Sequence, residues 1–208
     1  KEIDRIIIIM ESVRVVVRYR FEDCEETEFD NWEFDRNGRR VFIPKKKNAD
    51  FSFDRVLGPE TDQVELYESV GDYTVKNFVG GFNGTIFAYG QSGSGKTFSM
   101  LGPEKVPETL IKEGAENVPD DVQEVFGVIP RATVQMFTAI NEGVEKGVTF
   151  SVKCSYLEIY NESVNDLLST PVKNGLKIRE FPNLGMCVMG AEERFITTPE
   201  EVFQCLAI

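Results

Sequence analysis

The chain has 208 residues, a formal net charge of −12 and no histidine. The lack of histidine excludes Ser-His-Asp and Cys-His catalysis, and it excludes metal sites built on imidazole. The net negative charge argues against a surface that coats DNA or RNA, so we expect no nucleic-acid partner. A hydrophobic fraction of 41% and this length indicate a globular protein of one large domain, or two at most.

Two further features bear on location. The N-terminal apolar run, residues 6–10, is much shorter than the ~20 residues of a membrane span and lacks a signal-peptide cleavage site, so no membrane partner is expected. The cysteines form no C-x-x-C pair, which favours reduced thiols inside the cell. They are Cys24, Cys154, Cys187 and Cys205. We therefore expect a protein of the cytoplasm or cytoskeleton.

The N-terminal part of the chain has the patterns of short strands. Residues 1–12 are interpreted as an N-terminal extension, ahead of a β-branched, partly alternating segment that predicts a strand over residues 13–20. Similar patterns predict short strands over residues 39–43 and 51–53. The acidic stretch between the first two strands, residues 22–35, is interpreted as a solvated loop.

A helix and a buried strand are predicted next. Apolar side chains recur at helical spacing over residues 65–79, with Thr61 or Asp62 available as the N-cap. Residues 85–89 are almost uniformly apolar, which is typical of a strand buried on both faces of a mainly parallel sheet. A helix is then expected to start over residues 96–101.

The second half alternates loops and short elements. Residues 102–127 contain three prolines and many acids, and predict a long acidic loop insertion. The elements expected after it are a helix over 131–141, a strand over 148–159, a short helix over 163–168, a hairpin over 176–189 that turns at 182–185, and a helix that starts at Thr198 and Pro199.

One motif carries recognisable chemistry. Residues 90–97 fit the pattern G-x-x-x-x-G-K-[ST], which is the P-loop of triphosphate-binding proteins. Glycine at positions 93 and 95 lets the backbone curl so that successive N–H groups point inward, and the helix that follows adds its positive end. Lys96 would reach the β- and γ-phosphates, and the Thr97 hydroxyl would ligate Mg²⁺. A plain glycine-rich turn would not require Lys96 beside Thr97.

Hydrolysis requires more than a P-loop. It also needs an acid at a strand end that coordinates Mg²⁺, together with a group that senses the γ-phosphate. No apolar strand ending in Asp-x-x-Gly occurs between Thr97 and Ile208. Asp166 lies in a pattern that suggests a helix, and it is interpreted as a surface or capping acid.

The segment around the P-loop resembles that of kinesin motor domains. Residues 83–97 are similar to the P-loop segment of that family, and matches in the same order extend the resemblance from about Val13 to Leu206. The further matches are Arg18 and Arg20 of an R-x-R motif, residues 53–56, the G-V-I-P-R element at 127–131, and the S-Y-L-E-I-Y-N-E stretch at 155–162 followed by D-L-L at 166–168.

The resemblance implies a set of nucleotide contacts. The phosphates would be wrapped by Gln91, Ser92, Gly93, Ser94, Gly95, Lys96 and Thr97, with Lys96 and Thr97 as the catalytic pair. The adenine side would be formed by Arg18, Arg20, Phe21, Tyr67 and Phe98, where Phe21 replaces the proline usual in the family and an aromatic ring could stack instead. The cofactors implied are ATP or ADP and Mg²⁺.

The resemblance also suggests roles for two surface features, a loop and a hairpin. The loop 102–127 matches one that flanks the nucleotide pocket, and the alternative is a passive insertion. The hairpin 176–189 falls on part of the microtubule-facing surface, where Lys173, Lys177 and Arg179 could meet acidic tubulin or could simply be solvated.

The fold class expected is α/β, a P-loop NTPase with a kinesin-like central mixed β-sheet flanked by helices and apparently incomplete. Residues 13–208 would form the N-terminal part of a motor domain, with switch I and switch II absent, so that residues 1–208 alone would be inactive. The function implied is the ATP-binding part of a microtubule motor. The alternatives are a non-motile kinesin-like module that binds nucleotide or tubulin, and an unrelated P-loop NTPase. The oligomeric state stays open.

Overall fold

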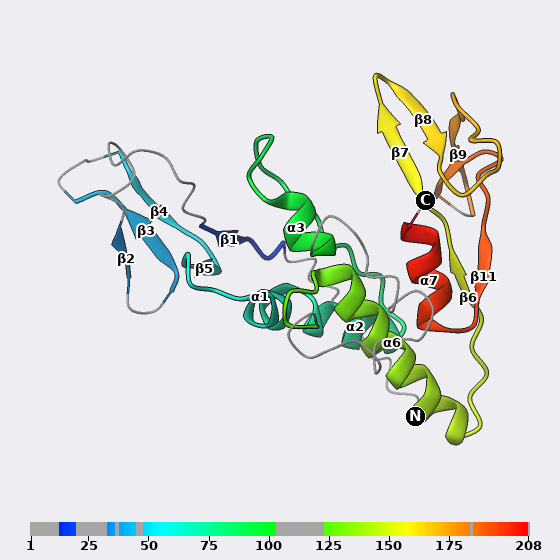
Figure 1. The fold of residues 1–208 in the computed structure, drawn as a ribbon, viewed down its shortest axis with the longest axis horizontal. Helices are drawn as coiled ribbons and strands as arrows, with labels where there is room; N and C mark the ends of the chain where they lie inside the picture. Colours follow the sequence, from blue (N-terminus) through cyan, green and yellow to red (C-terminus); the bar gives the residue numbers. More distant parts are fainter. Residues whose placement is uncertain are drawn as a thin grey trace, which may run out of the picture. The chain divides into compact units, whose positions relative to one another are not determined.

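The computed structural model describes residues 13–19, 33–35, 38–44, 48–102, 123–183 and 185–207 (Figure 1). The expected extension 1–12 and most of the expected loop insertion, residues 103–122, lie outside the described residues. The chain divides into two compact units, residues 1–61 and residues 62–208, and each is treated separately below.

The described residues of the first unit form five short strands. Strands β1 (Val16–Arg18) and β5 (Arg55–Leu57) form a parallel pair. A separate antiparallel sheet of order β2-β3-β4 consists of β2 (Glu33–Phe34), β3 (Arg40–Phe42) and β4 (Asp50–Ser52). The buried apolar side chains among its described residues are Val41, Ala49, Val56 and Leu57. The three predicted strands of this region are therefore confirmed: β1 and β3 are shorter than predicted, and β4 has the predicted length but begins one residue earlier.

The second unit contains the helices. They are α1 (Gln63–Val70), α2 (Asp72–Val79), α3 (Lys96–Leu101), α6 (Val128–Glu145) and α7 (Pro199–Leu206). Its core lies where α7 packs on α6 beside β6 and β11 (Figure 1), and includes Phe137, Leu168, Ile196 and Cys205. Within the described ranges, no helix is both long and apolar enough to span a membrane.

In the part of the second unit that the structure describes, the strands form three antiparallel pairs. These are β6 (Val152–Cys154) with β11 (Arg194–Ile196), β7 (Leu157–Tyr160) with β8 (Ser163–Asp166), and β9 (Ile178–Phe181) with β10 (Gly185–Val188). The last pair confirms the hairpin predicted over residues 176–189. Cys154, Cys187 and Cys205 are free thiols, as expected for them, and burial raises the pKa of Cys154. Cys24 lies outside the described residues.

The helix predicted over residues 65–79 is in fact two helices. Asp62 is the N-cap of α1, and its carboxylate accepts a hydrogen bond of 2.7 Å from the Glu65 N–H. The helix is interrupted at Gly71, which lies so close to the Tyr67 ring that a Cβ at this position would overlap the ring. Of the two predicted caps, Thr61 and Asp62, the structure has Asp62, but the close approach of the Tyr67 ring to the Gly71 backbone leaves no sign in the apolar pattern.

The buried strand predicted over residues 85–89 is not a strand here. The segment is extended, but no described residue forms a ladder with it. Alternate side chains are half-buried, whereas Phe87 is 81% and Tyr89 is 90% exposed. A strand requires a hydrogen-bonding neighbour, and the described residues place none beside this segment.

Two other elements differ from expectation. The long strand expected over residues 148–159 is interrupted at 155–156, so that β6 pairs with β11 while β7 pairs with β8. The helix expected over 163–168 is instead strand β8. Asn161 and Glu162 have φ values of +48° and +62°, which is the left-handed geometry of a two-residue hairpin turn, and this turn directs β8 back along β7.

The remaining helices follow their sequence signals closely. Helix α6 includes the predicted 131–141 and begins earlier, at Val128, because Pro130 fits in a first turn that needs no N–H donor from it. Helix α7 begins after Thr198 with a capping box, in which the Thr198 hydroxyl accepts from the backbone of Glu201 and the Glu201 carboxylate accepts from the backbone of Thr198. Pro199 occupies the first turn of α7, as predicted.

Candidate functional site

The candidate site is the glycine-rich loop between the extended segment 82–90 and helix α3 (Figure 1). Gly93 and Gly95 have φ values of +83° and +87°, which side chains with a Cβ rarely adopt. Gly95 is the N-cap residue of α3, and the helix begins directly with Lys96 and Thr97. Gly95, which the motif requires before Lys96, and Gly93 within the loop therefore both have left-handed backbone geometry.

The loop is closed tightly at its base. The Ser94 N–H donates to the Gln91 carbonyl over 3.2 Å, so the chain turns back on itself within four residues. Gly90 lies under the Ser94 hydroxyl, and a Cβ at Gly90 would overlap it. Glycine is thus required at position 90 because of a close approach rather than an unusual φ.

Lys96 reaches back across this loop. Its Nζ donates to the carbonyl oxygens of Gly90 and Gln91 over 2.9 and 2.8 Å. The ammonium is therefore held at the start of the loop by two backbone oxygens. The Thr97 side chain is exposed at the second position of α3, and the Phe98 ring that follows is 39% exposed.

Helix α3 and the segment just ahead of α6 are fixed by contacts that the sequence did not reveal. The Gln63 side chain, at the start of α1, is 3% exposed and donates to the carbonyl oxygens of Phe98 and Val125. The Arg131 guanidinium donates to the carbonyls of Phe126 and Gln123 over 2.9 and 2.7 Å. One signal could have identified Gln63: it lies three residues before Leu66, in phase with the buried face of α1.

Tyr67 is engaged in a network between α1, α2 and α6. Its hydroxyl donates to Gln135, whose amide donates to Asp72 over 2.8 Å, and Asp72 pairs with Lys76 over 2.8 Å. Burial, followed by the nearby Asp72 carboxylate, raises the pKa of Tyr67 to about 12. The hydrogen bond from Lys76 lowers the pKa of Asp72. The Tyr67 hydroxyl is thus a neutral donor, and it is directed at α6.

The other predicted adenine contacts are less fully described. Arg18, in the first unit, ends β1 and donates to the Thr61 carbonyl over 3.2 Å. Arg20 and Phe21 lie outside the described residues. The structure therefore brings residues 91–98 together in one loop and helix start, while the proposed roles of Arg18, Arg20, Phe21 and Tyr67 remain predictions.

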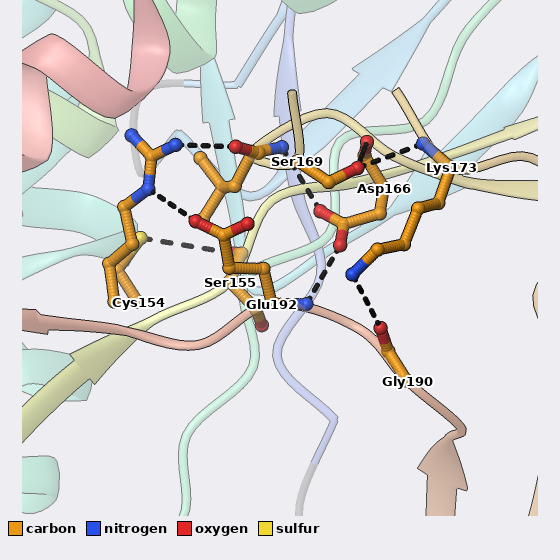
Figure 2. A network of polar contacts seen from close by, with 9 residues as sticks. Cys154, Ser155, Asp166, Ser169, Lys173, Gly190 and Glu192 are labelled. Atoms are coloured by element: carbon orange, nitrogen blue, oxygen red, sulfur yellow. Dashed lines mark hydrogen bonds and ion pairs between the residues drawn. The ribbon is translucent and has the colours of Figure 1, made fainter. Parts of the chain in front are cut away.

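Asp166 is a buried carboxylate at the end of strand β8, so of its interpretation as a surface or capping acid the surface position is wrong. It is 0% exposed, and its two carboxylate oxygens accept from the Leu168 and Glu192 N–H groups over 3.0 and 2.7 Å. Figure 2 shows the carboxylate directed at the backbone of Glu192, with Ser169 and Lys173 beside it. Since its oxygens are occupied by backbone donors, Asp166 connects the end of β8 to the segment before β11 rather than serving the P-loop.

Other sites of chemistry are not evident in the described part of the chain. No group of three or more His, Cys, Asp or Glu side chains that could hold a metal ion occurs there. An apolar cavity of about 290 Å³ between α2 and α6 is lined by residues such as Val75, Ile86 and Met136, and its lining includes no residue of the glycine-rich loop. The glycine-rich loop therefore remains the candidate site.

A loop of this geometry, followed by a helix that begins with Lys and Thr, is typical of P-loop nucleotide-binding proteins. Residues 19–208 match the family profile described as the kinesin motor domain. The chain therefore belongs to the kinesin motor domain family, and both the resemblance and the fold class predicted from its sequence are confirmed.

Individual relatives agree with this assignment. The chain is 40% identical over 158 residues to Kinesin-related protein 5 of Dictyostelium discoideum, which is 76% of this chain and 15% of that protein. It is 39% identical over 160 residues to Kinesin-like protein KIF15 of Homo sapiens, 76% of this chain and 11% of that protein. A solved fast kinesin superposes with a TM-score of 0.73 at 30% identity, covering 94% of this chain and 51% of that one. The chain thus spans a small part of its curated relatives.

Proposed function

We propose that the chain is the ATP-binding part of a kinesin-type microtubule motor, in which Mg-ATP hydrolysis drives movement along microtubules. The observation that carries the proposal is the closed glycine-rich loop, with Lys96 held across it, within a kinesin motor fold. The matched fast kinesin is described as having an ATPase mechanism and interactions with microtubules, and these properties are those of that protein. Their transfer to this chain is part of the proposal.

The loop suits the phosphates of ATP or ADP. Its left-handed glycines shape a backbone concavity, and the Lys96 ammonium already faces backbone oxygens there. Oxygen atoms of phosphate would replace the Gly90 and Gln91 carbonyls as acceptors for Lys96, and they would form shorter, charge-assisted hydrogen bonds. The glycine backbone and the Lys96 ammonium would thereby bind an anionic phosphate group, and no second cationic side chain is required.

Thr97 is the residue that would hold Mg²⁺. Its hydroxyl is exposed at the start of α3, and neutral oxygen donors of this kind suit a hard divalent cation. When bound, Mg²⁺ would neutralise charge that develops on the β- and γ-phosphate oxygens. The adenine would lie against Arg18, Arg20, Phe21, Tyr67 and Phe98, as the resemblance implies.

The proposed partner is the microtubule, and the proposed location is the cytoskeleton within the cytoplasm. Lys173, Lys177 and Arg179 are exposed on and before the β9–β10 hairpin, where they could approach the acidic surface of tubulin. The Lys173 ammonium lies 3.4 Å from the Gly190 carbonyl, a weak contact that leaves it able to exchange for a carboxylate. These three cations are the residues that we would test on the partner side.

The experiment is a microtubule-stimulated ATPase assay on the complete polypeptide that carries this sequence. Lys96→Ala should weaken ATP binding by more than about tenfold and abolish stimulated turnover, because a charge-assisted contact to the phosphates is lost. Lys146→Ala is the matched control, since Lys146 is exposed at the C-terminal end of α6.

Two results would contradict the proposal. Turnover that survives Lys96→Ala would show that ATP is bound elsewhere. Nucleotide or tubulin binding without any hydrolysis in the complete polypeptide would favour the non-motile module over the motor.

A further inference from the structure

Helix α3 carries the two residues on which the proposed site depends, yet it is short and only partly buried. It has six residues, which makes it about 9 Å long, and none of its side chains is buried. Lys96 and Thr97 occupy its first two positions, so any tilt of the helix moves both. Met100 and Leu101 are half-buried and α3 contacts α6, so this partial packing and the polar contacts of the helix together set its orientation.

The N-terminal end of α3 is held by the loop itself, and the C-terminal end is held by Gln63. The Gln63 Nε2 lies 2.6 Å from the Phe98 carbonyl oxygen and 3.3 Å from the Val125 carbonyl oxygen. A carboxamide NH₂ has two hydrogens, so one group can donate to both acceptors. We refer to Gln63 with these two carbonyls as the Gln63 bridge.

The Gln63 bridge joins two parts of the chain that are distant in sequence. Phe98 belongs to α3, whereas Val125 lies where the chain returns after residues 103–122, just ahead of α6. The Gly127 N–H donates to the Leu101 carbonyl over 3.2 Å, and a Cβ on Gly127 would lie 2.5 Å from the Met100 carbonyl carbon. The two backbones therefore touch at this point, with Gln63 fastened to both.

The returning segment is itself fixed to a long helix. Arg131, in the second turn of α6, donates to the carbonyls of Gln123 and Phe126. Burial lowers the pKa of Arg131, but an arginine remains charged at neutral pH and its hydrogen bonds are correspondingly strong. A rigid support, consisting of α1 and α6, thus holds the C-terminal end of helix α3.

We propose that Gln63 is a positioning residue for the nucleotide: the Gln63 bridge fixes the orientation of α3 and thereby places Lys96 and Thr97 against the phosphates. This inference rests on the proposed function, because it assumes that residues 90–97 bind ATP or ADP. If the bridge served stability alone, its loss would lower the unfolding temperature without changing nucleotide affinity. The two roles therefore separate experimentally.

The test compares Gln63→Met with Ser69→Ala in the complete polypeptide. Methionine keeps the length of the side chain and removes both donors. Ser69 is a matched control, because it is 1% exposed in the same helix and its hydroxyl donates to the Glu65 carbonyl, over 2.7 Å, within α1. Titration with a fluorescent ADP analogue in the presence of Mg²⁺ gives the affinity, and a thermal melt of each variant gives the stability.

We expect Gln63→Met to weaken the affinity about tenfold, the order expected when one net hydrogen bond to a positioned group is lost. Ser69→Ala should keep the wild-type affinity within about twofold even where its melting temperature falls. Equal affinities for wild type and Gln63→Met would overturn the inference while the proposed function stood. Failure of the wild type to bind the analogue would refute the nucleotide site, and this inference with it.

A second variant and a measurement on the wild type keep the inference testable if Gln63→Met misfolds. Gln63→Glu keeps the volume but directs a carboxylate oxygen at two carbonyl oxygens, so it should weaken affinity at least as much as Gln63→Met. In the wild type, the Gly102 N–H donates to Phe98 and the Gly127 N–H donates to Leu101. Both amides should exchange hydrogen more slowly once Mg-ADP is added, and unchanged exchange at both would overturn the inference.

Discussion

Asp166 offers the sharpest test of the packing, because its carboxylate is fully buried and satisfies two backbone donors, one of them 26 positions away. Its oxygens accept from the Leu168 N–H over 3.0 Å and the Glu192 N–H over 2.7 Å (Figure 2). In Asp166→Asn the carbonyl oxygen can accept from one of these groups, while the new NH₂ faces the other. One backbone N–H is then left without an acceptor inside the protein.

The magnitude follows from that count. An unsatisfied buried donor costs about 1–3 kcal/mol, so we expect Asp166→Asn to lower the free energy of unfolding by about 2 kcal/mol. For a domain of this size that corresponds to a drop of about 4–8 °C in the melting temperature. Urea unfolding and thermal melts of the complete polypeptide measure both quantities.

The control is a carboxylate of the same region that lies at the surface. Glu193 pairs with Lys153 over 2.8 Å, and both side chains are about half exposed, at 59% and 47%. Glu193→Gln should therefore change stability by less than about 0.5 kcal/mol. A loss of less than about 0.5 kcal/mol for Asp166→Asn as well would refute the reasoning that the Asp166 oxygens serve two buried donors.

Two further predictions concern helix ends. Hydrogen bonds from the Thr197 backbone and side chain, and then from the Thr198 backbone, lower the pKa of Glu201 below its usual 4.5. Ionised Glu201 thus stabilises the fold above pH 4.5, and this contribution is lost as the pH falls through the lowered pKa of the folded state. The melting temperatures of wild type and Glu201→Gln should therefore differ at about pH 7 and converge toward about pH 3. Gly71→Ala should destabilise the protein although alanine favours helices by about 1 kcal/mol, because its Cβ would displace the Tyr67 ring. A stabilised Gly71→Ala variant in urea unfolding would contradict this packing.

The parts of the fold that were predictable are those set by local chemistry. The glycines at 93 and 95, the capping box of α7 and the turn of the β9–β10 hairpin each depend on residues within a few positions of one another. The P-loop is of this kind, which explains why residues 90–97 could be identified from the sequence. Its agreement with the structure is therefore agreement about backbone geometry, and the nucleotide contacts remain to be tested.

The parts that were not predictable depend on partners distant in sequence. Gln63 and Asp166 are polar residues whose importance comes from carbonyl or N–H groups 26 to 62 positions away. The same holds for β8, whose pattern suits a helix, until the Asn161–Glu162 turn pairs it with β7. A one-dimensional pattern records which side chains are apolar, but it does not record which backbone groups they will meet.

Residues 85–89 show the limit of that reasoning most clearly. Their uniform apolar character predicted burial on both faces, and in the described residues only the face that carries Ile86 and Ala88 is half-covered. Phe87 and Tyr89 stack on each other with ring centroids 6.4 Å apart and otherwise lie exposed. Two large rings beside the P-loop are costly to leave in water, at about 25 cal/mol per Å² of apolar surface. The uniform apolar pattern thus indicates a strand that is covered on both faces within a sheet. Such a strand forms only where neighbouring strands pair with it.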